Sequence, residues 1–235
     1  MAGRWLSYVA AAAIVQLLTG CSAEQPAGNM AGSQQMPANG HVPATDGKLI
    51  LAFGDSLYAG YGVAQNESFP YELRRALRTA GVAADVRNAG VSGETTLGGL
   101  QRLAFTLDGL PRKPDLVLLG LGGNDMLRGL NPAQSDANLR AILDQLRERG
   151  IPVLLTGMLA APNMGADYAR RFNAIYPKLA EDYRIPLYPF FLDGVIGDPR
   201  LMQADSIHPN PAGVDEITRK LTPRVVDALR QNEAG

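Results

Sequence analysis

Four short segments of this 235-residue chain carry the residue types that acyl transfer requires. They read Gly-Asp-Ser-Leu at 54–57, Ser-Gly-Glu at 92–94, Gly-Gly-Asn-Asp at 122–125 and Asp-Ser-Ile-His-Pro at 205–209. They offer a nucleophilic hydroxyl, a backbone donor on a small residue, a side-chain amide donor, and an imidazole with its carboxylate. Each segment alone is unspecific. Their combination indicates serine hydrolase chemistry that needs no metal ion and no cofactor.

The candidate nucleophile is Ser56 and the candidate base is His208. A serine hydroxyl is a poor nucleophile at neutral pH and needs a neighbouring base to take its proton. The chain has two histidines, and His41 lies in a polar stretch near the N-terminus, so His208 is the available imidazole. Asp205 stands three residues before it, where a carboxylate can orient the ring and stabilise the imidazolium. The competing interpretation is a histidine that only satisfies local polar contacts.

The place of Ser56 in the sequence, directly after a predicted strand, favours it over the other serines. The same sheet edge is where the donors for an oxyanion are expected. Ser56 follows the apolar run at 48–53, although its segment is not the G-x-S-x-G motif of α/β-hydrolases. A tetrahedral intermediate needs donors, and we assign the N–H of Ser56, the N–H of Gly93 and the side-chain amide of Asn124. Gly93 has no Cβ to hold a substrate away. For Gly93 and Asn124 the alternative is turn formation alone, which is also the role expected of Asp55.

Five segments predict the strands that must position these residues. Apolar runs cover residues 48–53, 115–120 and 152–157, residues 84–88 form a weaker strand, and residues 185–189 contain two prolines and suit an edge. Runs without polar alternation favour parallel strands that are covered on both faces. Sites in such sheets form beyond the carboxyl ends of the strands. The four segments are therefore expected to meet at one edge of the sheet.

Helical patterns separate the predicted strands. They lie at residues 68–80, 131–150, 168–183 and from 210 onward. An Asn-Pro pair starts the second and the last of them, as an N-cap followed by the first helical residue. Pro223 is expected to kink or split the last helix. The alternation of strands and helices predicts an α/β fold with a parallel sheet.

The N-terminal residues are expected to lie outside that fold. Residues 1–20 combine a basic start with an apolar run too short for a bilayer span, which is typical of a signal peptide. The segment at 18–21 (Leu-Thr-Gly-Cys) resembles a bacterial lipobox, which implies that Cys21 is lipidated. The alternative is a plain secretory signal with an incidental cysteine. Residues 21–47 are expected to form a flexible tether and residues 48–235 the catalytic domain.

The segments resemble a known family, the SGNH hydrolases, also called the GDSL lipase/esterase family. Within it the chain is similar to the thioesterase I, lysophospholipase L1 and arylesterase group, over roughly residues 48–230. The resemblance implies a flavodoxin-like three-layer α/β/α sandwich with a five-stranded parallel sheet. It also implies a serine esterase for aryl and acyl esters, thioesters and lysophospholipids, without metal or cofactor. The family roles transfer to Ser56, Asp205 and His208 as catalytic residues and to Ser56, Gly93 and Asn124 as oxyanion donors.

Two other functions remain open at this point. A carbohydrate O-deacetylase uses the same fold and site, although few aromatic residues are evident here for stacking on sugars. A lipoprotein could keep the fold without catalysis, but the complete set of five site residues argues against this.

The segments at 125–130 and 158–164 are predicted to hold the acyl chain. Both follow predicted strands and mix glycine with apolar residues, which suits a partly mobile apolar wall. The substrate-binding residues expected there are Met126, Leu127, Leu159 and Pro162. The resembling group has a loop after its Gly-Asn-Asp segment that closes over acyl chains. The alternative is that these residues pack on the core.

Composition limits the other partners. The net charge is −1 and there is no basic stripe, so nucleic acid is not an expected partner. Cys21 is the sole cysteine, which excludes an internal disulfide. We expect a monomer that binds a small acyl ester or thioester and contacts a membrane through its N-terminal lipid. The expected location is the bacterial cell envelope, at the outer membrane or the periplasmic face.

Overall fold

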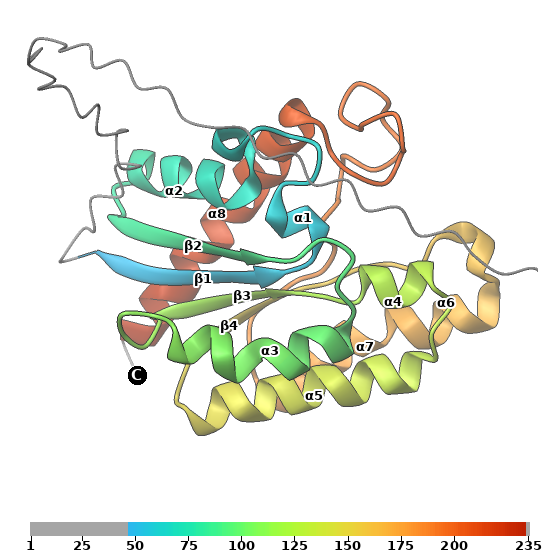
Figure 1. The fold of residues 1–235 in the computed structure, drawn as a ribbon, viewed down its shortest axis with the longest axis horizontal. Helices are drawn as coiled ribbons and strands as arrows, with labels where there is room; N and C mark the ends of the chain where they lie inside the picture. Colours follow the sequence, from blue (N-terminus) through green and yellow to red (C-terminus); the bar gives the residue numbers. More distant parts are fainter. Residues whose placement is uncertain (1–46, 234–235) are drawn as a thin grey trace, which may run out of the picture. The chain divides into compact units, whose positions relative to one another are not determined.

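The computed structural model describes residues 47–233, so the predicted signal peptide, Cys21 and nearly all of the tether lie outside the described residues. A five-stranded parallel sheet runs through this part in the order β2-β1-β3-β4-β5 (Figure 1). The strands are β1 (Lys48–Gly54), β2 (Ala84–Gly90), β3 (Leu116–Gly120), β4 (Val153–Thr156) and β5 (Leu187–Tyr188). The predicted α/β fold with a five-stranded parallel sheet is confirmed.

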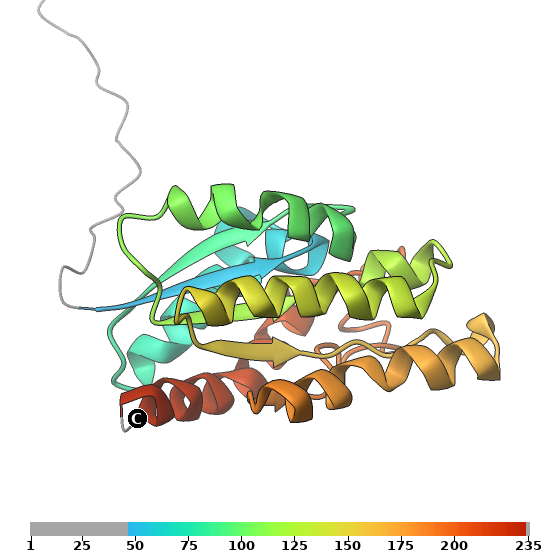
Figure 2. The ribbon, with the colours of Figure 1, turned by 90° about the horizontal axis from the view of Figure 1, so that it is seen from below.

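Helices cover both faces of the sheet and make three layers. The helices are α1 (Ser56–Ala59), α2 (Phe69–Thr79), α3 (Thr96–Asp108), α4 (Gly123–Leu127), α5 (Pro132–Glu148), α6 (Ala166–Asn173), α7 (Ile175–Tyr183) and α8 (Pro211–Glu233), with 3-10 turns at Gln65–Glu67 and Pro162–Met164. Helices α2 and α8 cover one face, and α3, α5 and α7 cover the other (Figure 1). Figure 2 shows α5 in front of the sheet on the second face, running along the direction of the strands.

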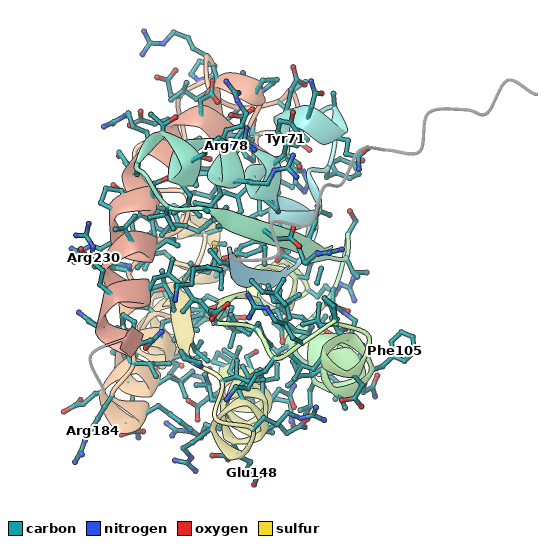
Figure 3. The ribbon with its side chains drawn as sticks, turned by 90° about the vertical axis from the view of Figure 1, so that its left-hand side faces the viewer. Tyr71, Arg78, Phe105, Glu148, Arg184 and Arg230 are labelled. Carbon is teal, nitrogen blue, oxygen red and sulfur yellow. The ribbon has the colours of Figure 1, made fainter. Side chains whose placement is uncertain are left out.

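Each central strand divides its side chains between two cores. Ile50 and Ala52 of β1 pack toward α2 and α8, while Leu51 and Phe53 pack toward α3 and α5. All four are buried, as expected for a parallel strand covered on both sides. Seen along the sheet in Figure 3, side chains fill both interlayer spaces, whereas Phe105 of α3 points outward. The apolar runs of the sequence are therefore the centre of the fold.

Three glycines end three neighbouring strands in register, and they explain where α1 can lie. Gly54 of β1 pairs with Gly90 of β2 and with Gly120 of β3. A Cβ on Gly54 or Gly120 would lie 2.5 or 2.4 Å from the ring of Tyr58, and one on Gly90 would lie 2.2 Å from the backbone nitrogen of Ala59. The glycines thus let α1 pass directly over the strand ends, which places the start of α1 at the sheet edge.

One helix prediction was wrong, and one of two alternatives for another is excluded. The single helix expected at 168–183 is two helices, α6 and α7, that meet at Ala174. Pro177 has no N–H to donate to the carbonyl of Asn173, so a continuous helix would lack a hydrogen bond at this point. The last helix is not split, since α8 continues through Pro223. The carbonyl that Pro223 leaves unbonded belongs to the exposed Arg219, where water can satisfy it.

Candidate active site

Ser56 begins α1 in a turn that is fixed at both ends. Asp55 is the N-cap, and its Oδ1 accepts the N–H of Leu57 at 3.1 Å. Gly60 ends the helix with a φ of 84°, a left-handed conformation that glycine adopts without strain. Between them Tyr58 is buried, with its hydroxyl 2.8 Å from Thr156 Oγ1. The short helix therefore holds Ser56 at the carboxyl end of β1.

A chain of hydrogen bonds joins Ser56, His208 and Asp205. The Oγ of Ser56 lies 2.8 Å from Nε2 of His208, and Nδ1 of His208 lies 2.7 Å from Oδ2 of Asp205. Oδ1 of Asp205 also accepts the backbone N–H groups of Ile207 and His208. These hydrogen bonds, led by that of the His208 backbone, lower the pKa of Asp205 to about 2. The carboxylate beside the imidazole is therefore ionised at neutral pH.

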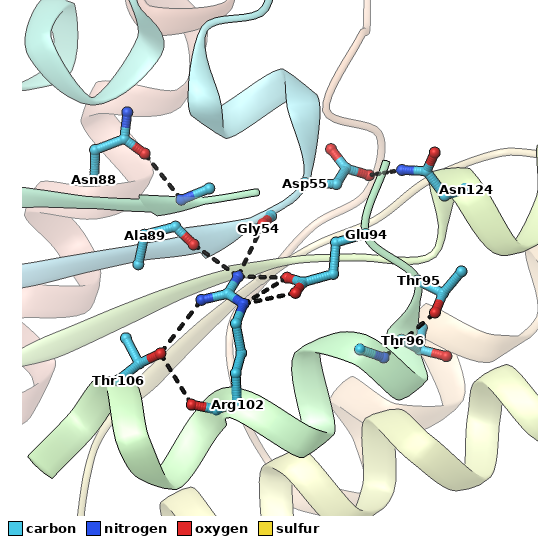
Figure 4. Close-up of polar contacts among 12 residues, drawn as sticks. Gly54, Asp55, Asn88, Ala89, Glu94, Thr95, Thr96, Arg102, Thr106 and Asn124 are labelled. Atoms are coloured by element: carbon cyan, nitrogen blue, oxygen red, sulfur yellow. Dashed lines mark hydrogen bonds and ion pairs between the residues drawn. The ribbon is translucent and has the colours of Figure 1, made fainter. Parts of the chain in front are cut away.

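Asn124 lies near the start of α4 and borders the same cavity as Ser56. Its Nδ2 donates to Oδ2 of Asp55 at 3.3 Å, so the residue before the nucleophile also orients the amide (Figure 4). Asp55 is buried, and burial raises its pKa to about 6. The predicted turn role of Asp55 was incomplete, because the same carboxylate caps α1 and contacts Asn124.

Gly93 lies in the loop between β2 and α3, with a φ of 78°. The N–H of Val91 donates to the carbonyl of Gly54 at 3.0 Å, which holds the start of this loop against the nucleophile turn. The carbonyl of Gly93 accepts from Nη2 of Arg128 at 2.6 Å. Gly93 does not border the cavity described below, unlike Ser56 and Asn124. The structure thus places Gly93 in a loop tied to the nucleophile turn, while its N–H role stays a prediction.

Arg102 of α3 also holds the loop between β2 and α3, through Glu94. Its guanidinium donates to both carboxylate oxygens of Glu94 and to the carbonyls of Gly54 and Ala89 (Figure 4). It also lies over the ring of Phe53, 4.0 Å from the centroid. A half-buried ion pair with several carbonyl contacts fixes its partners more firmly than an exposed pair does. Arg102 was not predicted from the sequence, although Glu94 belongs to the second chemical segment.

A cavity of about 820 Å³ opens beside Ser56 and Asn124. All four predicted substrate-binding residues border it, namely Met126, Leu127, Leu159 and Pro162. Met126 is largely buried and joins the core, whereas Leu127 is 51% exposed and Leu159 is 42% exposed. Packing on the core therefore describes Met126 but not the two leucines.

The opposite wall of the cavity was not predicted. It comes from the irregular segment between β5 and α8, with Phe190, Leu192, Ile196, Pro199, Met202 and Ile207. The sequence did contain a signal for this wall, because the apolar residues at 190–202 directly precede Asp205 and His208. The cavity is therefore apolar on two sides and has the Ser56 hydroxyl at its border.

Residues 47–233 hold no group of three or more histidine, cysteine, aspartate or glutamate residues arranged for a metal ion. Within the same range, no helix has both the length and the apolar character needed to cross a bilayer.

Comparison with known proteins decides the family. Residues 52–215 match the GDSL-like Lipase/Acylhydrolase family. The chain belongs to this family. An arylesterase of Vibrio mimicus is 42% identical over 180 residues, which cover 77% of this chain and 89% of the relative. The thioesterase 1/protease 1/lysophospholipase L1 of Escherichia coli K12 is 40% identical over 186 residues, covering 77% and 86%.

Solved structures of the GDSL-like family agree with this assignment. The SGNH-hydrolase family esterase AlinE4 is 52% identical, with a TM-score of 0.67 over 78% of this chain and 97% of its own. The resemblance to SGNH hydrolases and their thioesterase, lysophospholipase and arylesterase group is confirmed. The chain is accordingly a serine ester hydrolase of the GDSL-like family.

Proposed function

We propose that this hydrolase cleaves carboxylic esters and thioesters through an acyl-Ser56 intermediate. The observation that carries the proposal is the continuous set of hydrogen bonds from Ser56 through His208 to Asp205 beside an apolar cavity. Ser56 Oγ attacks the substrate carbonyl carbon while Nε2 of His208 takes the hydroxyl proton. The imidazolium then returns this proton to the leaving alcohol or thiol as the C–O or C–S bond breaks. Water repeats the sequence and releases the acid.

The negative charge of the tetrahedral intermediate would be stabilised by the N–H of Ser56, the N–H of Gly93 and the amide of Asn124. Asn124 is already oriented by Asp55, and the loop of Gly93 is held by Arg128 and Arg102. Donors held in place before the reaction lose no energy in reorganising when the charge develops. The ionised Asp205 would stabilise the imidazolium that forms in the same step.

The preferred substrates would have an apolar acyl or aryl group. Two apolar walls border the cavity, and each buried CH₂ contributes about 0.8 kcal/mol of binding. We expect kcat/KM to rise with acyl length up to medium chains. Aryl esters, thioesters and lysophospholipids are candidates because relatives are named an arylesterase and a thioesterase/lysophospholipase. Nothing in the two apolar walls favours an acetylated sugar, so O-deacetylation becomes an outcome of the test.

A substrate panel and one variant test this proposal. The panel holds p-nitrophenyl esters of two to sixteen carbons, acyl thioesters, lysophospholipids and acetylated sugars. Ser56→Ala should abolish hydrolysis without shifting the thermal midpoint by more than a few degrees, because the hydroxyl is a reagent and not a core group. An alkylphosphonate should label the wild type once, on the peptide that contains Ser56. Turnover by Ser56→Ala, or activity confined to acetylated sugars, would refute the proposal.

The acyl groove can be located with two exposed leucines. Leu127→Ser and Leu159→Ser should flatten the chain-length profile and spare acetate esters, because both side chains border the cavity and stay partly exposed. Leu97→Ser is the matched control, since Leu97 is an exposed leucine of α3 outside the cavity. If both cavity variants keep the wild-type profile, the acyl chain binds elsewhere.

We further propose that Cys21 carries a lipid that anchors the enzyme in the bacterial envelope, with residues 21–47 as tether. The support is the lipobox-like sequence and the lack of leucine, isoleucine and aromatic residues of the Phe, Tyr and Trp type between it and β1. Cys21→Ala should release the enzyme from membranes at unchanged specific activity. Retention of this variant on the membranes of its host would contradict lipidation. A monomer is proposed as well, and sedimentation of the released form tests it.

A further inference from the structure

The side chain of Gln203 bridges two segments that carry the reacting groups. Its Nε2 donates one hydrogen bond to the carbonyl of Tyr61 at 2.7 Å and another to the carbonyl of Pro209 at 2.9 Å. Its own backbone N–H donates to the carbonyl of His208 at 2.8 Å. One amide therefore ties the loop after α1 to the loop before α8, although Tyr61 and Gln203 are 142 positions apart.

Both ends of this bridge lead directly to a reacting side chain. The N–H of Tyr61 donates to the carbonyl of Ser56 at 3.1 Å. The ring of Tyr61 lies against the imidazole of His208, with centroids 4.5 Å apart and planes tilted by 36°. The contacts thus form a closed circuit that runs from Ser56 to Tyr61, through Gln203 to His208, and back to Ser56 through Nε2 and Oγ.

The bridge supplies a restraint that the contacts of Asp205 do not. Asp205 bonds to His208 and Ile207, which belong to its own loop, so these bonds orient the ring within the loop. The bond from Gln203 to the Tyr61 carbonyl instead fixes that loop relative to α1. A displacement of about 1 Å at a reacting group can cost about 10²-fold in rate.

The residue type fits the task. A glutamine nitrogen carries two N–H donors and no charge, so it can satisfy two carbonyls at once. Gly62 leaves room for the crossing side chain, because a Cβ at Gly62 would lie 2.1 Å from Oε1 of Gln203. A glutamate at this position would have no donor when ionised.

We propose that Gln203 is a positioning residue that sets His208 Nε2 against Ser56 Oγ through Tyr61 and the loop before α8. The inference rests on the proposed function of Ser56 and His208. Gln203 borders the cavity as well, so a positioning role must be separated from a role in binding the acyl chain. The two roles predict different effects of acyl-chain length on the rate loss. Misplacing the base slows every substrate equally, whereas loss of an acyl-binding contact affects long-chain esters most.

Gln203→Met tests the inference, since methionine keeps the length and approximate volume of glutamine and removes both donors. We expect kcat to fall about 10- to 100-fold with KM within about two-fold, to the same extent for acetate and octanoate esters. The rate of phosphonate labelling of Ser56 should fall by a similar factor, and the low-field proton signal of the His208 ring should broaden or shift. Gln231→Met, an exposed glutamine near the end of α8, is the matched control.

Two further results keep the test decisive. Gln203→Glu should lower kcat in the same way, because an ionised glutamate of the same shape has no N–H donor for the carbonyls of Tyr61 and Pro209. This arm also stands if Gln203→Met fails to fold. Wild-type kcat in a folded Gln203→Met, or a loss restricted to long acyl chains, would overturn the inference. Absence of phosphonate on Ser56 in the wild type would instead overturn the proposed function.

Discussion

The two sides of the site beside Ser56 are built by different means. The donor side, with Gly93 and Asn124, is attached to helices and backed by buried polar groups. Asp125, which follows Asn124, is 2% exposed and accepts the N–H and hydroxyl of Thr96 and the hydroxyl of Ser135. These contacts join α4 to α3 and α5. The donor side is therefore attached to the core through Asp125, although Gly93 itself is exposed.

The acid–base side is an irregular loop at the surface. Between β5 and α8 the only regular pairing among the described residues is a single bridge between Met202 and Pro209. Asp205 is held by the backbone N–H groups of its own turn, and Ser206 has a φ of 57°, which is unusual for a residue other than glycine. On this side, local hydrogen bonds rather than burial hold Asp205 in place.

Two aspartates show the same contrast in charge. Burial raises the pKa of Asp55 on the donor side to about 6, while the backbone N–H of His208 and further hydrogen bonds lower the pKa of Asp205 to about 2. A carboxylate that stabilises an imidazolium must stay ionised, which an exposed turn with N–H donors ensures. Donors for an oxyanion must be rigid, which core packing ensures. The difference predicts that variants of the buried groups behind the donor side lose stability, whereas variants of the acid–base loop lose rate.

After Ser56→Ala, the largest effect on rate is expected from Asp205→Asn. The amide oxygen can still accept the N–H groups of the turn, but the amide nitrogen would face Nδ1 of His208 and favour the wrong tautomer. We expect kcat to fall by about 10⁴-fold while the free energy of unfolding changes by less than about 1 kcal/mol. Steady-state kinetics and urea unfolding on one preparation check this. A stability loss larger than the barrier increase would show that the turn depends on the carboxylate for folding.

Asn124→Ala should have the next largest effect on rate, with kcat lower by about 10²- to 10³-fold and a much smaller change in KM. Its amide acts mainly on charge that develops in the transition state. Asn232→Ala, on the exposed end of α8, is the control. An effect on KM alone would make Asn124 a substrate-binding residue.

Asp125→Ala should mainly reduce stability. It leaves the N–H and hydroxyl of Thr96 and the hydroxyl of Ser135 without their acceptor, at about 1–3 kcal/mol for each buried unsatisfied group. We expect a loss of roughly 3 kcal/mol or more in the free energy of unfolding. Asp125→Asn should recover part of it, since the hydroxyls can rotate toward an amide. Equal stability of the alanine variant and the wild type would contradict the attachment of the donor side to the core through Asp125.

The sequence predicted the donor side and the acid–base side unequally well. Strands and site segments could be predicted because apolar runs that end in glycine are local patterns. The structure gives the reason for these glycines, since Gly54, Gly90 and Gly120 lie in register where α1 passes over the strand ends. Helix α3 was not predicted, since Gly98 and Gly99 disfavour helix. Gly99 is required there because a Cβ would lie 2.3 Å from Leu121.

The second cavity wall and the Gln203 bridge could not be predicted for another reason. They depend on contacts between loops that are far apart in the sequence and have no periodic pattern. The bond between Gln203 and Tyr61 is visible only after the sheet brings their loops together. The break at Ala174 had a local signal in Pro177, although α8 continues through Pro223 and shows that a proline alone does not decide a break.

The free energy of unfolding should depend on pH partly through the titration of Asp55. Its folded pKa of about 6 exceeds the ordinary value of 3.8, so the folded state binds the proton more tightly. This contribution is therefore greatest below pH 4 and is lost as the pH rises through about 6, by at most about 3 kcal/mol. Asp205 has the opposite sign, because its stabilisation is lost as the pH falls from about 4 toward 2.

Asp55→Asn should remove the decline of stability between pH 4 and 7, because asparagine also caps a helix but does not titrate. Urea midpoints measured across this range for both proteins provide the test. A constant difference between the two curves would mean that Asp55 is ionised throughout the range in the folded protein.

The smallest effect is expected at the two non-glycine residues that have a left-handed backbone within residues 47–233, Ser206 at φ 57° and Arg184 at φ 54°. Arg184 ends α7, away from the cavity, so it serves as the matched position. Glycine removes a steric cost of about 1–2 kcal/mol but adds conformational entropy to the unfolded chain. We expect Ser206→Gly and Arg184→Gly each to raise the free energy of unfolding by up to about 1 kcal/mol. A destabilised Ser206→Gly beside a stabilised Arg184→Gly would show that the acid–base loop depends on the Ser206 side chain, and its local hydrogen bonds would then not be sufficient to hold it.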